Sequence, residues 1–415
     1  MTSRRRGRIL AVHRYYWPDT PPYAALLRCI VGRWNDDGYD VEVISSQPSY
    51  KPETELEGRP AKELVDGVLV RRIRMRPDRS GRLRRVFNTF WFPLAVAVRI
   101  LLGPRHDVVM CSTSPPVLLG SAVSIAARAR GAAFVYHCMD LHPEIGALSG
   151  EFANRRLYSV LLRLDTATCR RASTVIVLSR DMKQALLRRD ASLADKIVVL
   201  NNFELPSFEE SADAPSPLPR DHTRLRIAFT GNLGRFQGLE SLTAAVLAGG
   251  PALGALEIVF MGEGAVKQAL VDQVEAAPPE VRDRVRFVPH GSVAAARALL
   301  RTADVGLVSL IPQVIGFAYP SKTATYLSEG LPLLVSVEPE SELAQMVVEG
   351  GIGSRLPTGD QKAVTETLID LVSRRAELPG VAARARELGR SEFSAETLLP
   401  RWSRLLEDVA GSRPR

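Results

Sequence analysis

The sequence has few cysteines and no pattern that would join them. Cys29, Cys111, Cys138 and Cys169 form no C-x-x-C pair, which argues against a disulfide framework and against a zinc site built on cysteine pairs. Scattered thiols are typical of a reducing compartment, so we expect a cytoplasmic protein. The opening stretch MTSRRRGRILAVHRYYW is charged and lacks the long apolar core and small-residue cleavage site of a signal peptide.

The two common nucleotide-binding glycine motifs are absent as well. The glycine-rich turn of this chain, TGNLGRFQGLE at 230–240, matches neither G-x-x-x-x-G-K-S/T nor G-x-G-x-x-G. Gly231, Gly234 and Gly238 nevertheless lie between an apolar run and a stretch with helical spacing. Glycine allows positive φ and lets main-chain N–H groups approach an anion at a helix N-terminus. The turn therefore favours a phosphate ligand, although a tight strand-to-helix connection without a ligand explains it equally well.

Length and periodicity predict two α/β domains. The 415 residues exceed what one hydrophobic core usually serves, and 46% hydrophobic with 24% charged residues is typical of globular proteins. Short β-branched runs alternate with helical spacing, which predicts parallel crossovers and doubly wound, Rossmann-like sheets. The expected strands are 8–13, 41–45, 68–73, 107–112, 132–137, 174–179, 196–201, 225–231, 256–262, 284–290, 305–310 and 331–337. Prolines, serines and acidic residues at 204–222 indicate a linker.

We therefore expect an N-terminal domain over residues 1–203, a linker over 204–223 and a C-terminal domain over 224–390. In doubly wound sheets the ligand lies beyond the carboxyl ends of the strands, so with two domains we expect it in the cleft between them.

The positive charge is concentrated in one place. The net charge is +8, and the stretch RRIRMRPDRSGRLRR at 71–85 has a single acidic residue. The apolar and aromatic segment VFNTFWFPLAVAVRILL follows it at 86–102, interrupted by Pro93 and Arg99. This combination predicts an interfacial element resting on anionic lipid. Its aromatics are not interleaved with the arginines, so we expect no nucleic acid partner. A basic loop before an ordinary buried helix is the alternative.

Further polar motifs occur at predicted strand ends. FMGEG ends one strand of the second domain, and in YPSKTATYLSEG we expect Ser321 to cap a helix and Lys322 to offer a point charge for phosphate. In the first domain VYHCMDLHPEIG carries a cluster made of His137, Asp140, His142 and Glu144. Its spacing matches no H-E-x-x-H site, so we expect no metal. Loop hydrogen bonding and helix capping explain the same residues without a ligand.

Taken in order, the motifs KIVVLNN, TGNLGRFQGLE, FMGEG, ADVGLVSL and PSKTATYLSEGLPLLVS, together with the earlier MDLHPE, resemble glycosyltransferase family 4. The similar branch comprises bacterial colanic-acid and O-antigen type enzymes of surface polysaccharide synthesis. The resemblance covers nearly the whole chain. It implies the GT-B fold, with a nucleotide-sugar donor on the C-terminal domain, an acceptor on the N-terminal domain, and retention of anomeric configuration without a metal. It also implies that residues 391–415 include a helix returning to the N-terminal domain.

The resemblance also implies roles for individual residues. The predicted catalytic residues are His137 near the transferred sugar and Arg235 and Lys322 at the donor diphosphate. The other predicted donor residues are Gly231, Asn232, Gly234, Gly262, Glu263, Gly264, Pro320, Ser321, Thr325 and Glu329. For the acceptor the resemblance implies Asp140 and Glu144 of the D-L-x-P-E signature. The other predicted acceptor residues belong to YYWPDTPPYAA at 15–25, which replaces the glycine-bearing loop that often follows the first strand in the family. Its aromatic residues suit stacking on a sugar; they are Tyr15, Tyr16, Trp17 and Tyr23. Loop packing explains the four aromatic residues nearly as well.

The sequence departs from the family pattern at three positions. Gln237 stands where many members have lysine. The two glutamates of the E-x7-E pattern would fall at Phe317 and Thr325, and the second of these normally contacts the donor ribose. Glu329 lies one helical turn after Thr325 and would compensate only if the helix were shifted.

The expected function is transfer of a sugar, most simply from a UDP-sugar, to a polyprenyl-diphosphate-linked saccharide by a cytoplasmic enzyme bound peripherally to the membrane. A soluble acceptor is the first alternative. A nucleotide-sugar 2-epimerase would need more carboxylates than the predicted cleft offers. A non-catalytic, membrane-docked scaffold would fit the missing glutamates.

Overall fold

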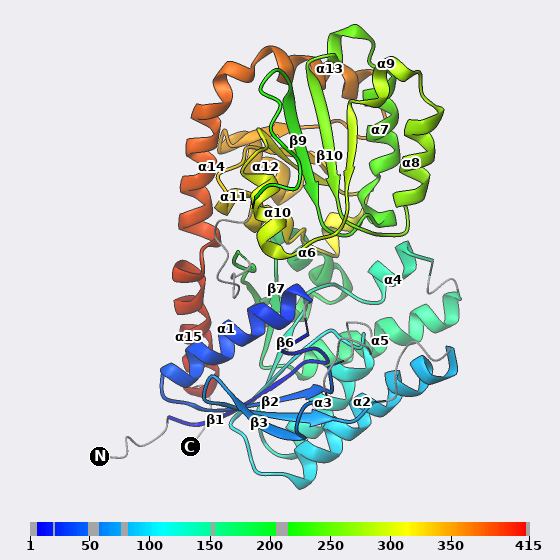
Figure 1. Cartoon of the computed structure of the whole chain (residues 1–415). Helices are drawn as coiled ribbons and strands as arrows, with labels where there is room; N and C mark the ends of the chain where they lie inside the picture. Colours follow the sequence, from blue (N-terminus) through cyan, green and yellow to red (C-terminus); the bar gives the residue numbers. More distant parts are fainter. Residues whose placement is uncertain are drawn as a thin grey trace. The chain divides into compact units, whose positions relative to one another are not determined.

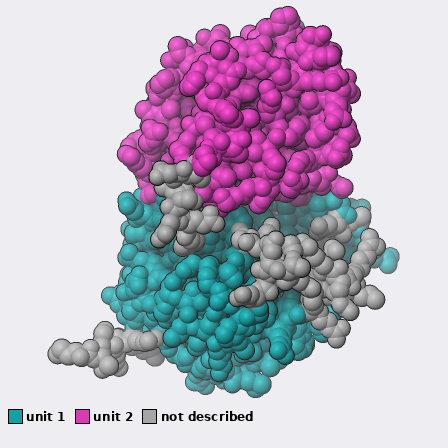
Figure 2. All heavy atoms as spheres, viewed as in Figure 1, with its two compact units in different colours: residues 1–205, 317–319, 395–415 teal, residues 206–316, 320–394 magenta. Residues whose placement is uncertain are grey.

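The structure is a computed structural model that describes residues 6–19, 21–48, 58–75, 82–150, 154–204 and 215–411, with the side chains of 82–85 left out. The chain forms two compact units (Figure 2). Unit 1 comprises Met1–Leu205, Phe317–Tyr319 and Ala395–Arg415, and unit 2 comprises Pro206–Gly316 and Pro320–Ser394. Two stretches of the later sequence therefore belong with the first unit.

Unit 1 is built on an eight-stranded sheet in the order β3-β4-β2-β1-β5-β6-β7-β8 (Figure 1). Every neighbouring pair is parallel except β3 with β4. Its strands are β1 (Arg8–Val12), β2 (Asp40–Ser46), β3 (Lys62–Val65), β4 (Val68–Ile73), β5 (Val108–Ser112), β6 (Ala133–His137), β7 (Thr174–Val177) and β8 (Ile197–Val199). Its helices are α1 (Pro22–Asp36), α2 (Arg82–Leu102), α3 (Leu118–Ala129), α4 (Glu144–Leu148), α5 (Arg155–Arg171), α6 (Arg180–Arg189) and α15 (Ala395–Gly411).

The C-terminal helix α15 is part of the unit 1 core. Trp402 packs edge-on against Trp34 of α1 with ring centroids 6.1 Å apart, and the Trp34 indole donates to the Trp402 carbonyl at 3.4 Å. Leu398, Leu405 and Leu406 share that buried cluster with β1 and β2. The apolar positions of α15 recur every three to four residues, which gives the helix one continuous buried face.

Unit 2 has a six-stranded, fully parallel sheet in the order β11-β10-β9-β12-β13-β14. Its strands are β9 (Leu225–Thr230), β10 (Leu256–Met261), β11 (Val285–Val288), β12 (Val305–Ser309), β13 (Leu333–Ser336) and β14 (Gly353–Arg355). Its helices are α7 (Leu239–Ala248), α8 (Lys267–Ala276), α9 (Pro279–Arg282), α10 (Val293–Leu300), α11 (Lys322–Ser328), α12 (Glu342–Glu349), α13 (Gln361–Ser373) and α14 (Leu378–Phe393).

The predicted pair of doubly wound α/β sheets is confirmed. Each expected strand is present, with ends that differ from the expected ones by at most two residues. Two strands were not predicted, β3 and β14. Both are short edge strands with polar or small residues, KELV and GSR, so their sequences carry little of the β-branched signal. Half of the expected linker, residues 205–214, lies outside the described residues.

The strand order shows where in each sheet a ligand is expected to bind. In unit 1 the chain reverses direction across the sheet between β1 and β5, and in unit 2 it does so between β9 and β12. Ligands of doubly wound sheets bind outside the carboxyl ends of the strands at such switch points. His13 and Ser112 lie at that point in unit 1, and the glycine turn that begins with Gly231 lies there in unit 2.

The basic segment proves to have two structural parts. Arg71 and Arg72 belong to β4, where Arg71 pairs with Glu42 at 2.5 Å and the buried Arg72 pairs with Glu63 at 2.6 Å. The prediction that the whole arginine stretch lies on lipid is therefore wrong for these two residues, because they neutralise carboxylates inside the fold. Residues 76–81 and the side chains of Arg82, Arg84 and Arg85 lie outside the described residues.

The segment after the arginines forms the helix α2, which buries only one face. Phe92, Val96 and Ile100 are buried, whereas Phe90 and Leu94 are exposed by 60% and 58%. The alternative prediction of an ordinary buried helix is therefore correct for one face of α2 only. None of the helices in the described ranges combines the length and the apolar character needed to cross a bilayer.

Candidate functional site

The glycine turn after β9 is held in the conformation that the sequence predicts, with one difference. Gly231 has φ +111° and Gly238 has φ +58°, values that side chains with a Cβ rarely adopt. Gly234 has φ −98°, so it is not needed for positive φ. A Cβ there would come within 2.8 Å of the Asn232 amide nitrogen and 2.9 Å of Gln237 Oε1. A glycine is therefore needed at this position because the side chains of Asn232 and Gln237 leave no room for a Cβ.

The second turn, after β10, packs directly on the first. Gly262 and Gly264 have φ +157° and +159°. A Cβ on Gly262 would overlap the carbonyl oxygen of Gly231, and one on Gly264 would overlap that of Leu233. The main chain also joins the turns, because Leu233 N donates to the Glu263 carbonyl at 2.8 Å. Two glycine turns thus form one rigid main-chain surface at the switch point of unit 2.

Lys322 supplies the positive charge beside this surface. Its Nζ would lie 3.4 Å from a Cβ on Gly231, and it lies over the Phe229 ring, 4.3 Å from the centroid. Burial lowers the pKa of Lys322 to about 8. No ion pair to Lys322 occurs among the described residues. A cation held against glycine turns and without a carboxylate partner fits a phosphate ligand.

The remaining predicted donor residues lie in different surroundings. Arg235 and Asn232 are exposed on the glycine turn. Glu263 pairs with Lys267 at 2.5 Å and keeps 60% of its side chain exposed. Ser321 is the N-cap residue of α11, as predicted, and follows Pro320, but its side chain makes no capping hydrogen bond.

The acidic residue expected to compensate on α11 is at the wrong end of the helix. Glu329 is the C-cap of α11 and pairs with Arg297 at 3.5 Å. Lys322 begins this seven-residue helix, so the two are separated by about 10 Å of helix axis. Thr325 lies one turn after Lys322 and is partly buried. The structure thus gives Glu329 a structural partner and leaves it away from the glycine turns.

Tyr326 is a supporting residue that sequence reasoning missed. It is fully buried, and its hydroxyl oxygen accepts from Thr230 N at 2.9 Å. It therefore ties α11 to the end of β9, the point at which the glycine turn begins. The missing Cβ of Gly306 makes room for its ring. A tyrosine followed by leucine on a helix reads as core, and only the three-dimensional structure reveals the polar contact.

In unit 1 the carboxyl ends of β1, β5 and β6 carry a buried polar cluster. His13 Nδ1 is hydrogen-bonded to Ser112 Oγ, and Tyr23 Oη is hydrogen-bonded to His137 Nδ1 at 2.8 Å. His137 is completely buried, with Trp402 edge-on at 4.9 Å. Among the described residues its Nε2 has no hydrogen-bond partner. Burial lowers the pKa of each imidazole to about 3, so both are neutral near pH 7.

The predicted acceptor aromatics divide into packed and accessible residues. Tyr16 and Tyr23 belong to the hydrophobic core of unit 1, and burial raises the pKa of both hydroxyls. Their predicted stacking on a sugar is therefore wrong for this structure, because their rings are covered. Trp17 has the guanidinium groups of Arg28 and Arg59 over its ring. Tyr15 is partly buried, with the Arg14 guanidinium 5.1 Å from its ring centroid, and stays a predicted acceptor residue.

Asp140 lies where the segment Phe317–Tyr319 returns to unit 1. It forms a β-bridge with Ala318, and Leu141 N donates to the Phe317 carbonyl at 2.7 Å. Burial raises the pKa of the Asp140 carboxyl to about 6. Phe317, where the family pattern would have its first glutamate, is thus hydrogen-bonded through its main chain to Leu141. The residue after it, Ala318, forms the bridge with Asp140, which carries a carboxyl group.

Glu144 is the clearest correction to the predicted acceptor residues. Its carboxylate takes two hydrogen bonds from Arg189, one of them 2.6 Å long, at the end of α6. Arg189 also pairs with the buried Asp165 of α5 at 2.7 Å, and Asp165 accepts from Tyr136 Oη at 2.8 Å. The carboxylate is consumed in this ion network, so Glu144 supports the loop and is not a free sugar ligand. The partner lies 45 residues further along the chain, which a local motif does not reveal.

A metal site is not formed by the cluster considered from the sequence. Within the described ranges no three histidine, cysteine or acidic side chains converge as metal ligands. His142 is partly buried, and burial followed by the charge of Arg189 lowers its pKa to about 4. Glu144, the other polar member, already binds Arg189.

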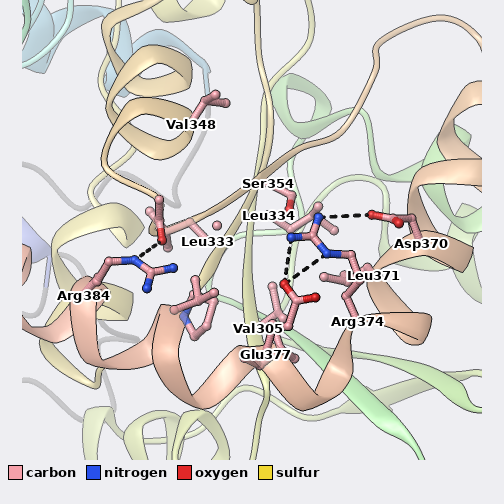
Figure 3. A pocket seen from close by; sticks show the side chains of 15 residues that line it. Val305, Leu333, Leu334, Val348, Ser354, Asp370, Leu371, Arg374, Glu377 and Arg384 are labelled. Atoms are coloured by element: carbon pink, nitrogen blue, oxygen red, sulfur yellow. Dashed lines mark hydrogen bonds and ion pairs between the residues drawn. The ribbon is translucent and has the colours of Figure 1, made fainter.

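Two cavities lie away from the predicted residues. The larger, about 400 Å³, is lined by Val305, Leu333 and Gly353, the first residues of β12, β13 and β14. It therefore lies at the amino ends of these strands, whereas the glycine turns follow the carboxyl ends of β9 and β10. Arg374 pairs with Glu377 and Asp370 on the rim of the cavity (Figure 3). A second cavity of about 260 Å³ lies at the end of α2 beside Leu102.

Comparison with known proteins identifies similar sequences. A family model described as glycosyl transferase 4-like domain matches residues 23–202. The probable glycosyltransferase WbjE of Pseudomonas aeruginosa is 29% identical over 297 residues, which are 70% of this chain and 71% of that protein. The putative colanic acid biosynthesis glycosyl transferase WcaI of Escherichia coli K12 is 24% identical over 325 residues, 74% of this chain and 78% of WcaI.

Solved structures share the fold across the whole chain. Sucrose-phosphate synthase of Thermosynechococcus elongatus superposes with a TM-score of 0.73 at 16% identity, covering 98% of this chain and 100% of that one. Anabaena HepE, solved with UDP and with UDP-glucose, gives TM-scores of 0.65 and 0.64 at 14% and 15% identity, with 97% of this chain and 100% of HepE covered. These are glycosyltransferase folds of the GT-B type.

Proposed function

We propose that this chain, which has the GT-B fold, is a glycosyltransferase of family 4. In this proposal it transfers a sugar from a UDP-sugar, with retention of anomeric configuration, to a saccharide carried on a polyprenyl diphosphate. The observation that carries the donor side is Lys322 held against two rigid glycine turns. The polysaccharide setting is supported by the relative WcaI, which is named for colanic acid biosynthesis. The choice of UDP is supported by HepE, which was solved with UDP and UDP-glucose.

The proposed chemistry follows the charge that develops in the reaction. The bond between the sugar carbon and the phosphate oxygen breaks, leaving a nucleoside diphosphate with added negative charge and an oxocarbenium-like sugar. Lys322, the exposed Arg235 and the main-chain N–H groups of the glycine turns stabilise that diphosphate in the transition state. These groups supply the charge in the proposed mechanism, which requires no metal.

We assign the acceptor's proton to the departing phosphate oxygen. The acceptor hydroxyl oxygen bonds to the sugar carbon while its proton moves to that phosphate oxygen, so atoms and charge balance. His137 is neutral and sealed beneath Trp402 and Tyr23, which fits a positioning role better than a base role. Tyr15 and Asp140 stay as proposed acceptor contacts.

The lipid acceptor is supported by the exposed face of α2. Along this face large apolar side chains recur at helical spacing from Val86 to Leu102, and Phe87 and Trp91 stack with ring centroids 6.0 Å apart. The helix contains no acidic residue. Such a helix binds at the boundary between headgroups and acyl chains of an anionic bilayer, at the cytoplasmic surface in our proposal.

The α2 contact is tested with vesicles. Replacing Phe90, Leu94 and Leu101 together with Gln should weaken partitioning onto vesicles that contain phosphatidylglycerol by about a hundredfold, because three side chains lose their burial in the bilayer. The matched control is the triple change Leu64→Gln, Val293→Gln and Val348→Gln, at exposed apolar positions of β3, α10 and α12. Equal partitioning of the α2 variant and this control would remove the membrane argument.

A further inference from the structure

Exposed apolar side chains gather on three helices of unit 1. Among the described residues 17 large hydrophobic side chains are exposed, and 12 of them lie on α2, α3 and α5. Those of α2 are Val86, Phe87, Phe90, Trp91, Leu94, Val98, Leu101 and Leu102. Ile125 of α3 and Leu157, Val160 and Leu164 of α5 complete the set. The apolar surface therefore extends well beyond the helix that the sequence singled out.

The three helices are neighbours in unit 1. Helix α3 packs against α2 on one flank and against α5 on the other, and they lie together in Figure 1. Ile125, exposed by 56%, comes from the middle helix of the three. We call the exposed side of these helices the α2–α3–α5 face.

Helix α5 is divided into a buried and an exposed side. Asp165, Thr168 and Cys169 are buried. Leu157 and Val160 are three residues apart and Leu164 follows four residues later, so the three side chains share one stripe of the helix, and all three are exposed. Val160 is exposed by 51%. An apolar stripe of this kind is usually covered in a folded protein or buried in a partner.

The charges on the α2–α3–α5 face favour one kind of partner. Exposed arginines on it are Arg99 of α2, Arg128 of α3, and Arg155, Arg156 and Arg163 of α5. The one acidic residue within the three helices is the buried Asp165. A second copy of the chain would place arginine against arginine. Apolar side chains among arginines instead match a bilayer with anionic headgroups.

We propose that α5, with α3, docks on the anionic bilayer beside α2, so that the α2–α3–α5 face is a single membrane-binding surface. This rests on the proposed function, in which α2 contacts the membrane. Contacts through α2, α3 and α5 together would fix the orientation of unit 1 on the bilayer. A single bound helix would leave unit 1 free to rotate about the helix axis.

The buried ion network connects this docking helix to the predicted acceptor loop. Asp165 is on the inner side of α5 and holds Arg189, which in turn holds Glu144 at the start of α4. Arg189 also donates to the carbonyl of His142 at 3.1 Å. The loop that carries Asp140 is therefore anchored to α5, whose outer side rests on lipid in our proposal. This anchoring would fix the distance between the loop and the bilayer surface, where a lipid-linked saccharide is presented.

The test compares four full-length variants, one of them the α2 variant described above, for partitioning onto phosphatidylcholine vesicles with and without phosphatidylglycerol. Changing Leu157, Val160 and Leu164 together to Gln should weaken partitioning by about tenfold or more, because their burial in the bilayer is lost. Changing Arg155, Arg156 and Arg163 to Gln should weaken it by roughly fivefold per arginine, and only on vesicles with phosphatidylglycerol. The triple control of Leu64, Val293 and Val348 should partition as wild type.

A shift in melting temperature with UDP, retained in each variant, shows that loss of vesicle binding is not loss of folding. If the α5 variants partition as wild type while the α2 variant does not, the α5 proposal is overturned and the α2 contact stands. A concentration-dependent dimer that the α5 substitutions dissociate, with no vesicle binding, would assign the face to a second copy and overturn the proposal. UDP-sugar turnover on a soluble acceptor analogue measures the proposed transfer separately from either result.

Discussion

Replacing Arg189 with Met is expected to lower the free energy of unfolding by about 3–5 kcal/mol. The guanidinium balances two buried carboxylates, those of Glu144 and Asp165. Removing it leaves Asp165, 2% exposed, without its cation, and an uncompensated buried charge costs about this much. Burial raises the pKa of Asp165 even with Arg189 present, so in the variant this carboxyl should take up a proton as part of its relaxation.

The measurement is urea unfolding followed by circular dichroism, with Arg188→Met as the matched control. Arg188 is the preceding residue on α6 and is exposed, so its replacement should change the free energy of unfolding by less than about 0.5 kcal/mol. Because the two units need not unfold together, the comparison uses the first transition. Equal transitions for the two variants would show that the ion network does not support the loop.

Replacing Lys322 with Ala is expected to lower kcat by about 10²- to 10³-fold. The ammonium lies directly beside Gly231, and removal of one preorganised group of this kind costs about that much. Lys362→Ala, at an exposed lysine of α13 in the same unit, should leave kcat unchanged. A loss of less than tenfold for Lys322→Ala would move the diphosphate contact to Arg235 or to the main chain alone.

The same residue predicts a pH dependence of donor binding. Burial lowers the pKa of Lys322 to about 8, from an ordinary value of 10.5. Its charge is therefore present below pH 8 and lost as the pH rises through 8, so donor affinity should fall over that range and binding should take up protons there. In Lys322→Arg the charge persists to higher pH, and the fall should disappear. Calorimetric titrations of UDP at several pH values make the comparison.

Much of the fold follows from local sequence because its strands are β-branched and buried on both faces. The run LRIAFT of β9 is buried at five of its six positions, and such a strand has a strong signal. The exceptions have physical causes. GSR in β14 joins the sheet through main-chain pairing with β13, and pairing with a strand some 20 residues earlier leaves no trace in its composition.

The candidate site was predictable to the extent that it depends on main-chain turns. Gly231 and Lys322 meet because their motifs follow β9 and β12 at the switch point, and the topology was visible in the order of the motifs. The roles of Glu144 and Tyr23 were not predictable in this way. Each is decided by a distant partner, Arg189 and His137 respectively, and only the tertiary structure brings these together.

The central claim is tested most directly by sugar transfer in a defined reaction. Nucleoside diphosphate release and lipid-linked product are measured with a panel of nucleotide sugars, with and without a polyprenyl-diphosphate-linked saccharide, for wild type, Lys322→Ala and His137→Ala. We predict release from a UDP-sugar that requires the lipid-linked acceptor and is lost in Lys322→Ala. A donor that raises the melting temperature but is not turned over with any acceptor would contradict the transferase mechanism, and turnover on soluble acceptors alone would contradict the lipid-linked substrate.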